Sequence, residues 1–356
     1  MYRVTENTDF LKPYHGFMCD ILKAMRKSFR ENVNYTKDEL ATNLTQINPN
    51  VKSFINRGNF LQKIYKLKDC PINLCKEYGK FASRYKSLLN GKWKGKSELL
   101  GESHTEFKDI FISFYEELLG YKTFNIALFQ TSSSLAEFRA MMSLNKVCPY
   151  CDLTKTRKDL VSVDHFLPKA HFPVLSIYPE NLIVACKGCN ETIKGENIKI
   201  PIAHPYYEEI SNYITFIIDE TDFMKYKVEI KINEGIPKLL KNKITNFIEL
   251  FKLKERYEEN ITAELRKFRN DVRKQALAEL NGVSHFQHIT REDIKVCTEK
   301  YFREAIIDNN TFKRAIDGTK IKNDYLNQIV NANDYQGDIE YLESHIHGLS
   351  AALKHG

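Results

Sequence analysis

The chain has 356 residues, enough for two or three domains, and its 42% hydrophobic and 28% charged residues are typical of an ordinary globular protein. It contains no apolar run near the ~20 residues that a membrane-spanning helix requires, which excludes a membrane-embedded protein. The first residues lack the apolar core of a signal peptide, so we expect a cytoplasmic protein with reduced thiols. The formal net charge of +7 suits a polyanionic partner but does not by itself identify one.

Residues 1–145 predict a helical N-terminal domain. One helix is expected over residues 106–119, where apolar side chains recur at helical spacing. A second helix should begin at Ser134, which has the Ser-x-x-Glu spacing of a capping box with Glu137. This second helix would lead directly into the first cysteine pair.

Two CxxC pairs lie within residues 146–206. They consist of Cys148, Cys151, Cys186 and Cys189. Four thiolates at this spacing can form a closed tetrahedral zinc site, which folds a local structure but leaves no open position for chemistry. The other cysteines lack the spacing of a disulfide framework; they are Cys19, Cys70, Cys75 and Cys297. We therefore expect one structural Zn²⁺ held by the two pairs.

The dipeptide Asp164-His165 lies between the two pairs, and Asn190 directly follows the last cysteine. Alternating apolar residues predict a short strand that ends at this dipeptide; three prolines make the next stretch a loop, and residues 190–194 can form a short helix. Asp164 and Asn190 offer oxygen atoms of the kind that Mg²⁺ or Mn²⁺ prefers. A neutral histidine beside them can activate a water molecule.

At these residues the chain resembles the HNH, or ββα-metal, endonuclease superfamily. The resemblance covers about 60 residues and rests on both CxxC pairs, Asp164-His165, Pro168, Asn181-Leu182, Cys-x-x-Cys-Asn and Lys194. It implies that His165 is the general base, that Asp164 is a metal ligand and that Asn181 braces the loop that orients the histidine. Asn190 stands where many members carry a histidine ligand. It matches an asparagine variant in a phage resolvase, where the asparagine still ligates magnesium.

The resemblance also implies the fold class: mainly α, with a central zinc-stapled ββα-metal nuclease module over residues 146–206, and so α+β overall. Residues 207–356 should form a C-terminal domain. Strands are expected there over residues 213–219 and 227–233, where β-branched and apolar side chains alternate. A long helix over about residues 254–280 and further helices should complete it.

Several basic residues have two interpretations. Lys187 and Lys194 are either solvated lysines or phosphate contacts. The basic loop over residues 90–97 either offers Trp93 to a nucleic acid or is an exposed loop with one anchoring tryptophan. Three arginines share one helix face, and we favour a solvated face over DNA contact; they are Arg266, Arg269 and Arg273.

Two further histidines accompany the module. His171 falls in the loop after the first strand, and His204 begins the run His-Pro-Tyr-Tyr. We expect both to pack or to form hydrogen bonds rather than to ligate a metal. The run itself indicates no mechanism.

These features predict a metal-dependent endonuclease that hydrolyses DNA phosphodiester bonds. Residues 243–257 resemble the helix that follows the nuclease module in the HNH subunit of Septu-type systems, which implies an anti-phage effector in a bacterial cytoplasm. Those subunits work with an ATPase, so a regulatory ATPase partner is expected. The oligomeric state does not follow from the sequence.

Two other functions fit parts of the sequence. The alternative is a non-catalytic zinc-knuckle adaptor that binds nucleic acid, although an adaptor has no need of a base beside oxygen ligands. A zinc nucleobase deaminase would use His104-Thr-Glu106 with the first CxxC pair. That assignment leaves the second pair and Asp164-His165 without a role.

Overall fold

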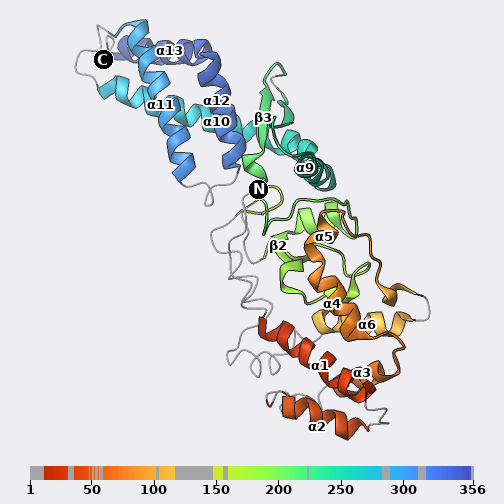
Figure 1. Cartoon of the computed structure of the whole chain (residues 1–356). Coiled ribbons are helices and arrows are strands. Elements are labelled where there is room, and N and C mark those ends of the chain that lie inside the picture. Colours follow the sequence, from red (N-terminus) through yellow and green to blue (C-terminus); the bar gives the residue numbers. More distant parts are fainter. Residues whose placement is uncertain are drawn as a thin grey trace.

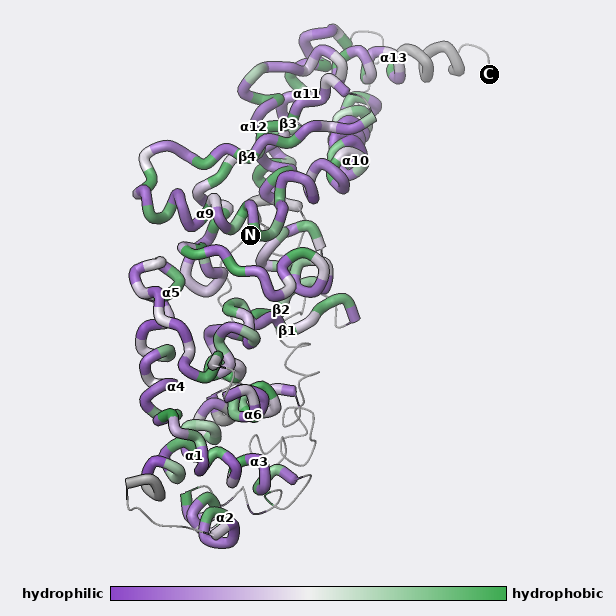
Figure 2. The backbone as a smooth tube through the Cα atoms, turned by 90° about the vertical axis from the view of Figure 1, so that its right-hand side faces the viewer, coloured by the Kyte–Doolittle hydropathy of each residue, from purple (hydrophilic) through white to green (hydrophobic). Residues whose placement is uncertain are grey.

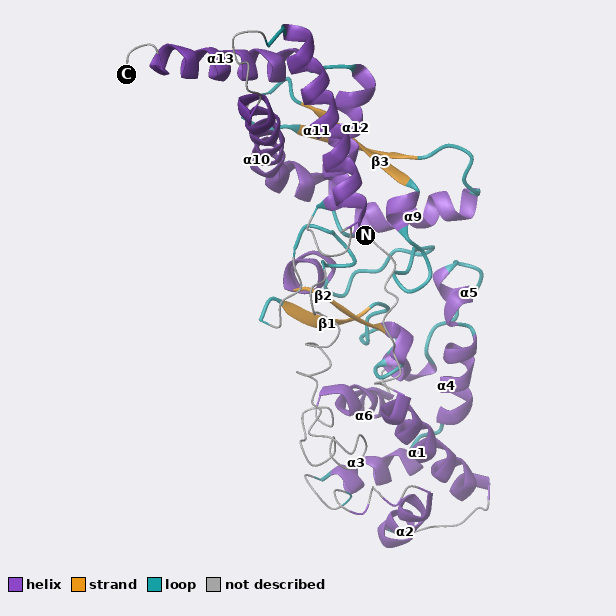
Figure 3. Cartoon of the chain, turned by 90° about the vertical axis from the view of Figure 1, so that its left-hand side faces the viewer, coloured by secondary structure: helices purple, strands orange, loops and turns teal. Residues whose placement is uncertain are grey.

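The computed structural model describes residues 12–30, 36–47, 59–101, 104–116, 147–154, 159–222, 224–282, 289–311 and 318–353, with the single residues 49, 52 and 55. The helix expected from Ser134 lies outside the described residues. Figure 1 shows an elongated molecule with the N-terminal helices at one end, the C-terminal helices at the other and the cysteine module between them. Figure 3 shows the strands as two small patches among helices.

The N-terminal region is helical, as the sequence predicts. Its helices are α1 (Lys12–Arg30), α2 (Lys37–Ile47), α3 (Phe60–Lys66), α4 (Leu74–Ser83), α5 (Tyr85–Leu89) and α6 (Thr105–Glu116), with short turns η3 (Leu67–Asp69) and η4 (Glu98–Leu100). The helix predicted over residues 106–119 is α6, which the structure describes as far as Glu116. Its apolar face is buried through Ile110, Phe111 and Phe114.

Trp93 anchors the basic loop. Its ring centroid lies 4.9 Å from that of Phe81, and the Arg84 guanidinium lies 5.6 Å from its centroid. Because the ring contacts both side chains and packs partly buried against the core, the loop corresponds to the anchoring interpretation and not to an open stacking surface.

The central module begins with β1 (Val161–His165), which pairs antiparallel with β2 (Leu182–Cys186). The register places Val161 opposite Cys186 and His165 opposite Leu182. The predicted strand is therefore present and carries the Asp-His dipeptide at its end. The intervening loop contains η7 (Pro173–Leu175) and η8 (Pro179–Asn181), and the π-helix η9 (Gly188–Lys194) follows β2 and ends at Gly195.

The C-terminal region starts with η10 (Ile210–Asn212) and an antiparallel hairpin, β3 (Ile214–Asp219) and β4 (Lys227–Ile232), within a residue of the predicted strands. Helices follow: α9 (Lys238–Leu250), α10 (Leu253–Gly282), α11 (Arg291–Thr311), α12 (Thr319–Ala332) and α13 (Gln336–Leu353). Helix side chains cap both outer edges of the hairpin. Phe216 N donates to Asp324 on α12, and Val228 N donates to Glu258 on α10. These bonds satisfy backbone N–H groups at the edges of the hairpin that could otherwise pair with another strand.

The predicted solvated face of arginines on α10 is wrong. Arg269 donates two hydrogen bonds to the carboxylate of Asp338, at 2.9 and 2.8 Å, and Arg273 Nε donates to the same group at 2.6 Å. Asp338 is fully buried on α13. A buried carboxylate needs such partners, so these two arginines join α10 to α13.

No described helix is long and apolar enough to cross a membrane. In Figure 2, hydrophilic and hydrophobic residues alternate along the helices, as they do when one face of each helix packs on a core.

Candidate zinc centre and histidine site

The four cysteines of the two CxxC pairs lie together and are buried. Their sulfur atoms are all within 4.8 Å of one another, and no other group of three or more His, Cys, Asp or Glu side chains in the described part of the chain could hold a metal ion. Tetrahedral Zn–S bonds of about 2.3 Å place sulfurs about 3.8 Å apart. Cys151 Sγ and Cys186 Sγ are 4.0 Å apart.

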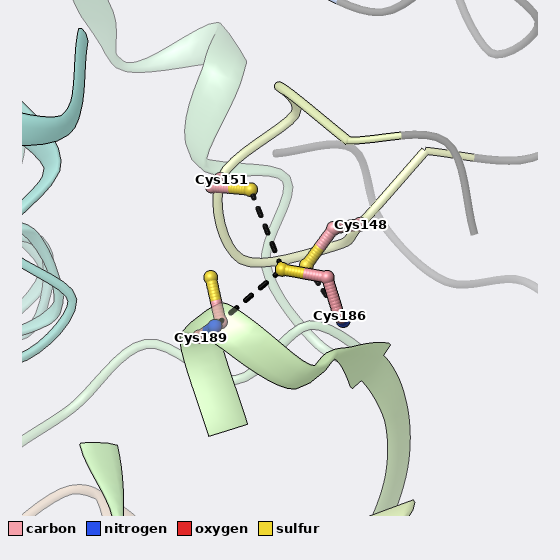
Figure 4. A group of neighbouring side chains, drawn as sticks. All are labelled: Cys148, Cys151, Cys186 and Cys189. Atoms are coloured by element: carbon pink, nitrogen blue, oxygen red, sulfur yellow. Dashed lines mark hydrogen bonds between the residues drawn. The ribbon is translucent and has the colours of Figure 1, made fainter. Parts of the chain in front are cut away.

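Local structure brings these sulfurs together. Cys148 and Cys151 lie on one turn, whereas Cys186 ends β2 and Cys189 lies on η9 (Figure 4). Cys186 N donates to Cys148 Sγ and Cys189 N donates to Cys186 Sγ, both at 3.4 Å. Backbone donors of this kind stabilise thiolates, and the four sulfurs offer a closed donor set. These residues therefore fit a structural zinc ion.

The C-terminal helices hold the cysteine turn in place. Tyr257 on α10 donates its hydroxyl to the Cys151 carbonyl at 2.6 Å, and Gly318 N, just before α12, donates to the Asp152 carbonyl at 2.6 Å. Arg256 Nη1 donates to Cys189 Sγ at 2.6 Å. A zinc ion in the cluster would thus also fasten the central module to the C-terminal region.

His165 is held by a backbone group on the loop. Its Nε2 lies 2.8 Å from the Ser176 carbonyl oxygen. A carbonyl only accepts, so Nε2 carries the proton and Nδ1 carries the lone pair. Burial, aided by the charge of Lys169, lowers the pKa of His165 to about 3. The imidazole is therefore neutral at pH 7 with its lone pair on Nδ1, and in this buried state it binds a proton only weakly.

The N-terminal region covers this histidine. The Tyr115 ring on α6 meets the imidazole edge-on with centroids 4.4 Å apart, and Ser176 Oγ donates to the Phe111 carbonyl at 2.7 Å. Lys169 forms an ion pair with Glu116 beside it. His165 is only 8% exposed as a result. The site is closed in this structure.

Asn181 joins the two ends of the loop. Its Nδ2 donates to the carbonyls of Leu167 and Leu175 at 3.0 and 3.2 Å, and its Oδ1 accepts from Leu167 N at 2.8 Å. Asn181 is fully buried. The loop that presents the Ser176 carbonyl is thus closed by one amide.

Asp164 points to the opposite face of β1 from His165, as strand alternation requires. Its Oδ1 accepts from Lys194 Nζ at 2.7 Å and its Oδ2 accepts from Tyr150 Oη at 2.6 Å. Lys194 also donates to the His165 carbonyl at 2.8 Å. Burial raises the pKa of Asp164, and the nearby Lys194 acts in the opposite direction.

Asn190 lies on the same side of β1 as Asp164. Its Nδ2 donates to Ser162 Oγ at 2.9 Å, two residues before Asp164, while Lys194 on the same helix reaches Asp164 itself. The carboxylate and the amide oxygen suit Mg²⁺ in kind. As the side chains lie, however, Lys194 and Tyr150 take both Asp164 oxygens, so these residues do not accommodate a divalent ion unless Lys194 moves.

The two lysines near the second cysteine pair, Lys187 and Lys194, differ in their exposure to solvent. Lys187 is exposed, whereas Lys194 is only 1% exposed and paired with Asp164. The solvated interpretation of Lys194 is therefore wrong, because a buried carboxylate holds this lysine; its contact with phosphate stays a prediction. His171 is exposed and His204 is buried.

Sequence reasoning missed four residues that complete the site. They are Tyr85, Tyr115, Tyr150 and Ser176. Tyr150 lies inside the first CxxC pair, which was a usable signal. The others come from distant segments or act through a backbone carbonyl, and no local pattern marks them.

Comparison with known proteins gives two partial matches. Protein ea31 of Escherichia phage lambda is 35% identical over 74 residues, which covers 19% of this chain and 24% of that protein. Septu protein PtuB of Bacillus thuringiensis is 40% identical over 76 residues, covering 20% of this chain and 29% of PtuB. The chain thus spans about a quarter of the length of these relatives. No family model and no solved structure matches it.

Proposed function

We propose that the chain is an HNH-type endonuclease that hydrolyses DNA phosphodiester bonds. The observation that carries this proposal is the orientation of His165: its protonated Nε2 is fixed on the Ser176 carbonyl, which reserves Nδ1 as a base. The four-cysteine cluster adjoins it through β2 and supports a zinc-stapled ββα-metal module.

In this proposal the neutral imidazole takes a proton from the attacking water at Nδ1. His165 then becomes a positively charged imidazolium, and the Ser176 carbonyl stabilises that charge by accepting the hydrogen bond from Nε2. Asn181 keeps that carbonyl in place by closing the loop on both sides. Asp164 and Asn190 are the residues that would hold Mg²⁺ or Mn²⁺, which supplies charge neutralisation at the phosphate when bound. Binding would require Lys194 to leave Asp164.

We propose three functional regions: a helical domain over residues 1–145, the nuclease module over 146–206 and a hairpin with helices over 207–356. The similarity to Septu protein PtuB supports a role in anti-phage defence alongside a regulatory ATPase. The burial of His165 and Asp164 supports the need for such regulation, because a phosphodiester cannot reach either group in the closed site.

Cleavage assays separate this function from the adaptor. The purified chain, with and without a co-purifying partner, is given plasmid, single-stranded DNA and RNA with EDTA, magnesium, manganese or zinc. A nuclease nicks DNA only with magnesium or manganese. An adaptor shifts the DNA in a gel under every condition and leaves it intact, and that result with the partner present would overturn the proposal.

A further inference from the structure

The run His204-Pro-Tyr-Tyr, for which the sequence indicates no mechanism, lies against the loop between β1 and β2 (residues 166–181). His204 is fully buried, and its ring meets Phe166 with centroids 4.3 Å apart. Tyr206 Oη donates to the Leu182 carbonyl at 2.8 Å, and Tyr207 Oη donates to the carboxylate of Glu180. Two side chains of this run thus contact the residues on either side of Asn181, and the third packs on Phe166 at the start of the same loop.

The proton positions in this contact follow from its donors. Tyr206 N donates to His204 Nδ1 at 3.2 Å, so that nitrogen is an acceptor and the neutral ring carries its proton on Nε2. His204 Nε2 lies 3.3 Å from Tyr85 Oη and also bonds to the Glu180 backbone, so its proton faces both the Tyr85 hydroxyl oxygen and the Glu180 carbonyl. The single hydroxyl proton of Tyr85 then goes to Asn181 Oδ1 at 3.0 Å, which is nearer than the Glu180 carbonyl at 3.4 Å.

The orientation of Asn181 is equally determined. Its Nδ2 faces two carbonyls, of Leu167 and Leu175, which can only accept. Its Oδ1 faces two donors, Leu167 N and the Tyr85 hydroxyl. A flipped amide would lose the three bonds to the backbone groups of Leu167 and Leu175. The Tyr85 hydroxyl therefore completes the set of bonds that fixes Asn181.

We infer that Tyr85 and His204 are positioning residues for His165. They form a hydrogen-bond chain from the His204 ring through Tyr85 to Asn181, which closes the loop that holds the Ser176 carbonyl against His165 Nε2. Tyr85 comes from α5. A residue of the N-terminal helical region thus helps to position His165. This inference rests on the proposed function.

The decisive variant is Tyr85→Phe, which removes one hydroxyl and keeps the ring that packs on Tyr178 and His204. Tyr178→Phe is the matched control, because it removes a neighbouring hydroxyl that donates to the Glu180 side chain and not to Asn181. Both variants should fold, as judged by circular dichroism and thermal melting.

The first readout needs no activity. In protein labelled with ¹⁵N-histidine, nuclear magnetic resonance of wild type and Tyr178→Phe should show His165 as a single Nε2-protonated tautomer with a slowly exchanging proton. Tyr85→Phe should show a mixture of tautomers or at least tenfold faster exchange of that proton. An unchanged His165 signal in Tyr85→Phe would overturn the inference, whether or not the protein cuts DNA.

The second readout is cleavage. Tyr85→Phe should lower kcat about 10-fold or more with KM for DNA unchanged, as loss of a supporting hydrogen bond does at other sites. His204→Gln, which retains a donor near the Nε2 position, should keep more activity than His204→Phe. Equal kcat in Tyr85→Phe and wild type would refute the positioning role. A wild-type protein that cuts no DNA even with its partner present would refute the proposed function, and the first readout would still test the hydrogen-bond chain from His204 to Asn181.

Discussion

Lys194 and Asp164 form a buried ion pair: Nζ lies 2.7 Å from Oδ1, and the two residues are 1% and 2% exposed. The pair joins η9 to β1 at the point where the sequence predicts a magnesium ligand. A lysine therefore balances this carboxylate in the closed site. Because Lys194 occupies an oxygen of Asp164, a metal ion that binds this carboxylate should break the Lys194–Asp164 ion pair.

Removing one partner of this pair should be costly. Lys194→Met leaves an uncompensated buried carboxylate and should lower the free energy of unfolding by about 3–5 kcal/mol. The double variant Lys194→Met with Asp164→Asn should recover much of that loss. Urea denaturation measures both, with the exposed lysine variant Lys187→Met as control. A loss below about 1 kcal/mol in Lys194→Met would show that the pair is not formed in solution.

The cysteine cluster should contain about one zinc ion per chain. Cys186→Ser should lose the ion and lower the melting temperature, because a structural zinc site contributes directly to folding. Cys297→Ser is the control, since Cys297 is a buried cysteine whose thiol donates to the Ala276 carbonyl, away from the cluster. Elemental analysis that finds no zinc in folded wild-type protein would contradict the assignment.

Stability should fall in mild acid. Burial lowers the pKa of both His165 and His204 to about 3, whereas an unfolded histidine titrates near 6.5. Between these values the unfolded chain binds protons that the folded chain does not. Each histidine therefore removes stability as the pH drops below 6.5, by about 1.4 kcal/mol per unit.

His165→Gln should reduce this pH dependence of the free energy of unfolding by the contribution of one histidine. Urea denaturation at pH 7, 6 and 5 measures the slopes. An equal slope in His165→Gln and wild type would mean that His165 is not held neutral in the folded state.

Tyr115 should limit access to His165. Tyr115→Ala removes the ring that covers the imidazole and should accelerate carbethoxylation of His165 by diethyl pyrocarbonate, followed by mass spectrometry of the peptide. Phe107→Ala is the control, because Phe107 lies more than two turns earlier on α6. Equal modification rates in both variants would show that α6 does not control access.

The sequence was sufficient for the parts of the site that local rules determine. CxxC spacing predicts the cysteine cluster, and apolar alternation predicts β1 with Asp164 and His165 at its end. It could not place Lys194. This side chain lies at the end of η9 and reaches Asp164 only because η9 packs on β1, which local sequence does not determine. It could not find Tyr85 or Ser176, since one is 96 residues from Asn181 and the other acts through its backbone.

The prediction of a solvated face for the arginines of α10 was wrong for a similar reason. Their spacing shows one shared face, but the side chain that decides their role is Asp338, 69 residues beyond Arg269. A stripe of charges on a helix is exposed or buried according to what packs on it, and that is tertiary information.

The most direct test of the central claim is plasmid cleavage in magnesium by wild type, His165→Ala and His171→Ala, in the presence of any co-purifying partner. Loss of a general base costs about 10²–10⁴-fold in rate, so His165→Ala should be inactive while His171→Ala cuts normally and both still bind DNA. Cleavage by His165→Ala at the wild-type rate would show that His165 is not the base.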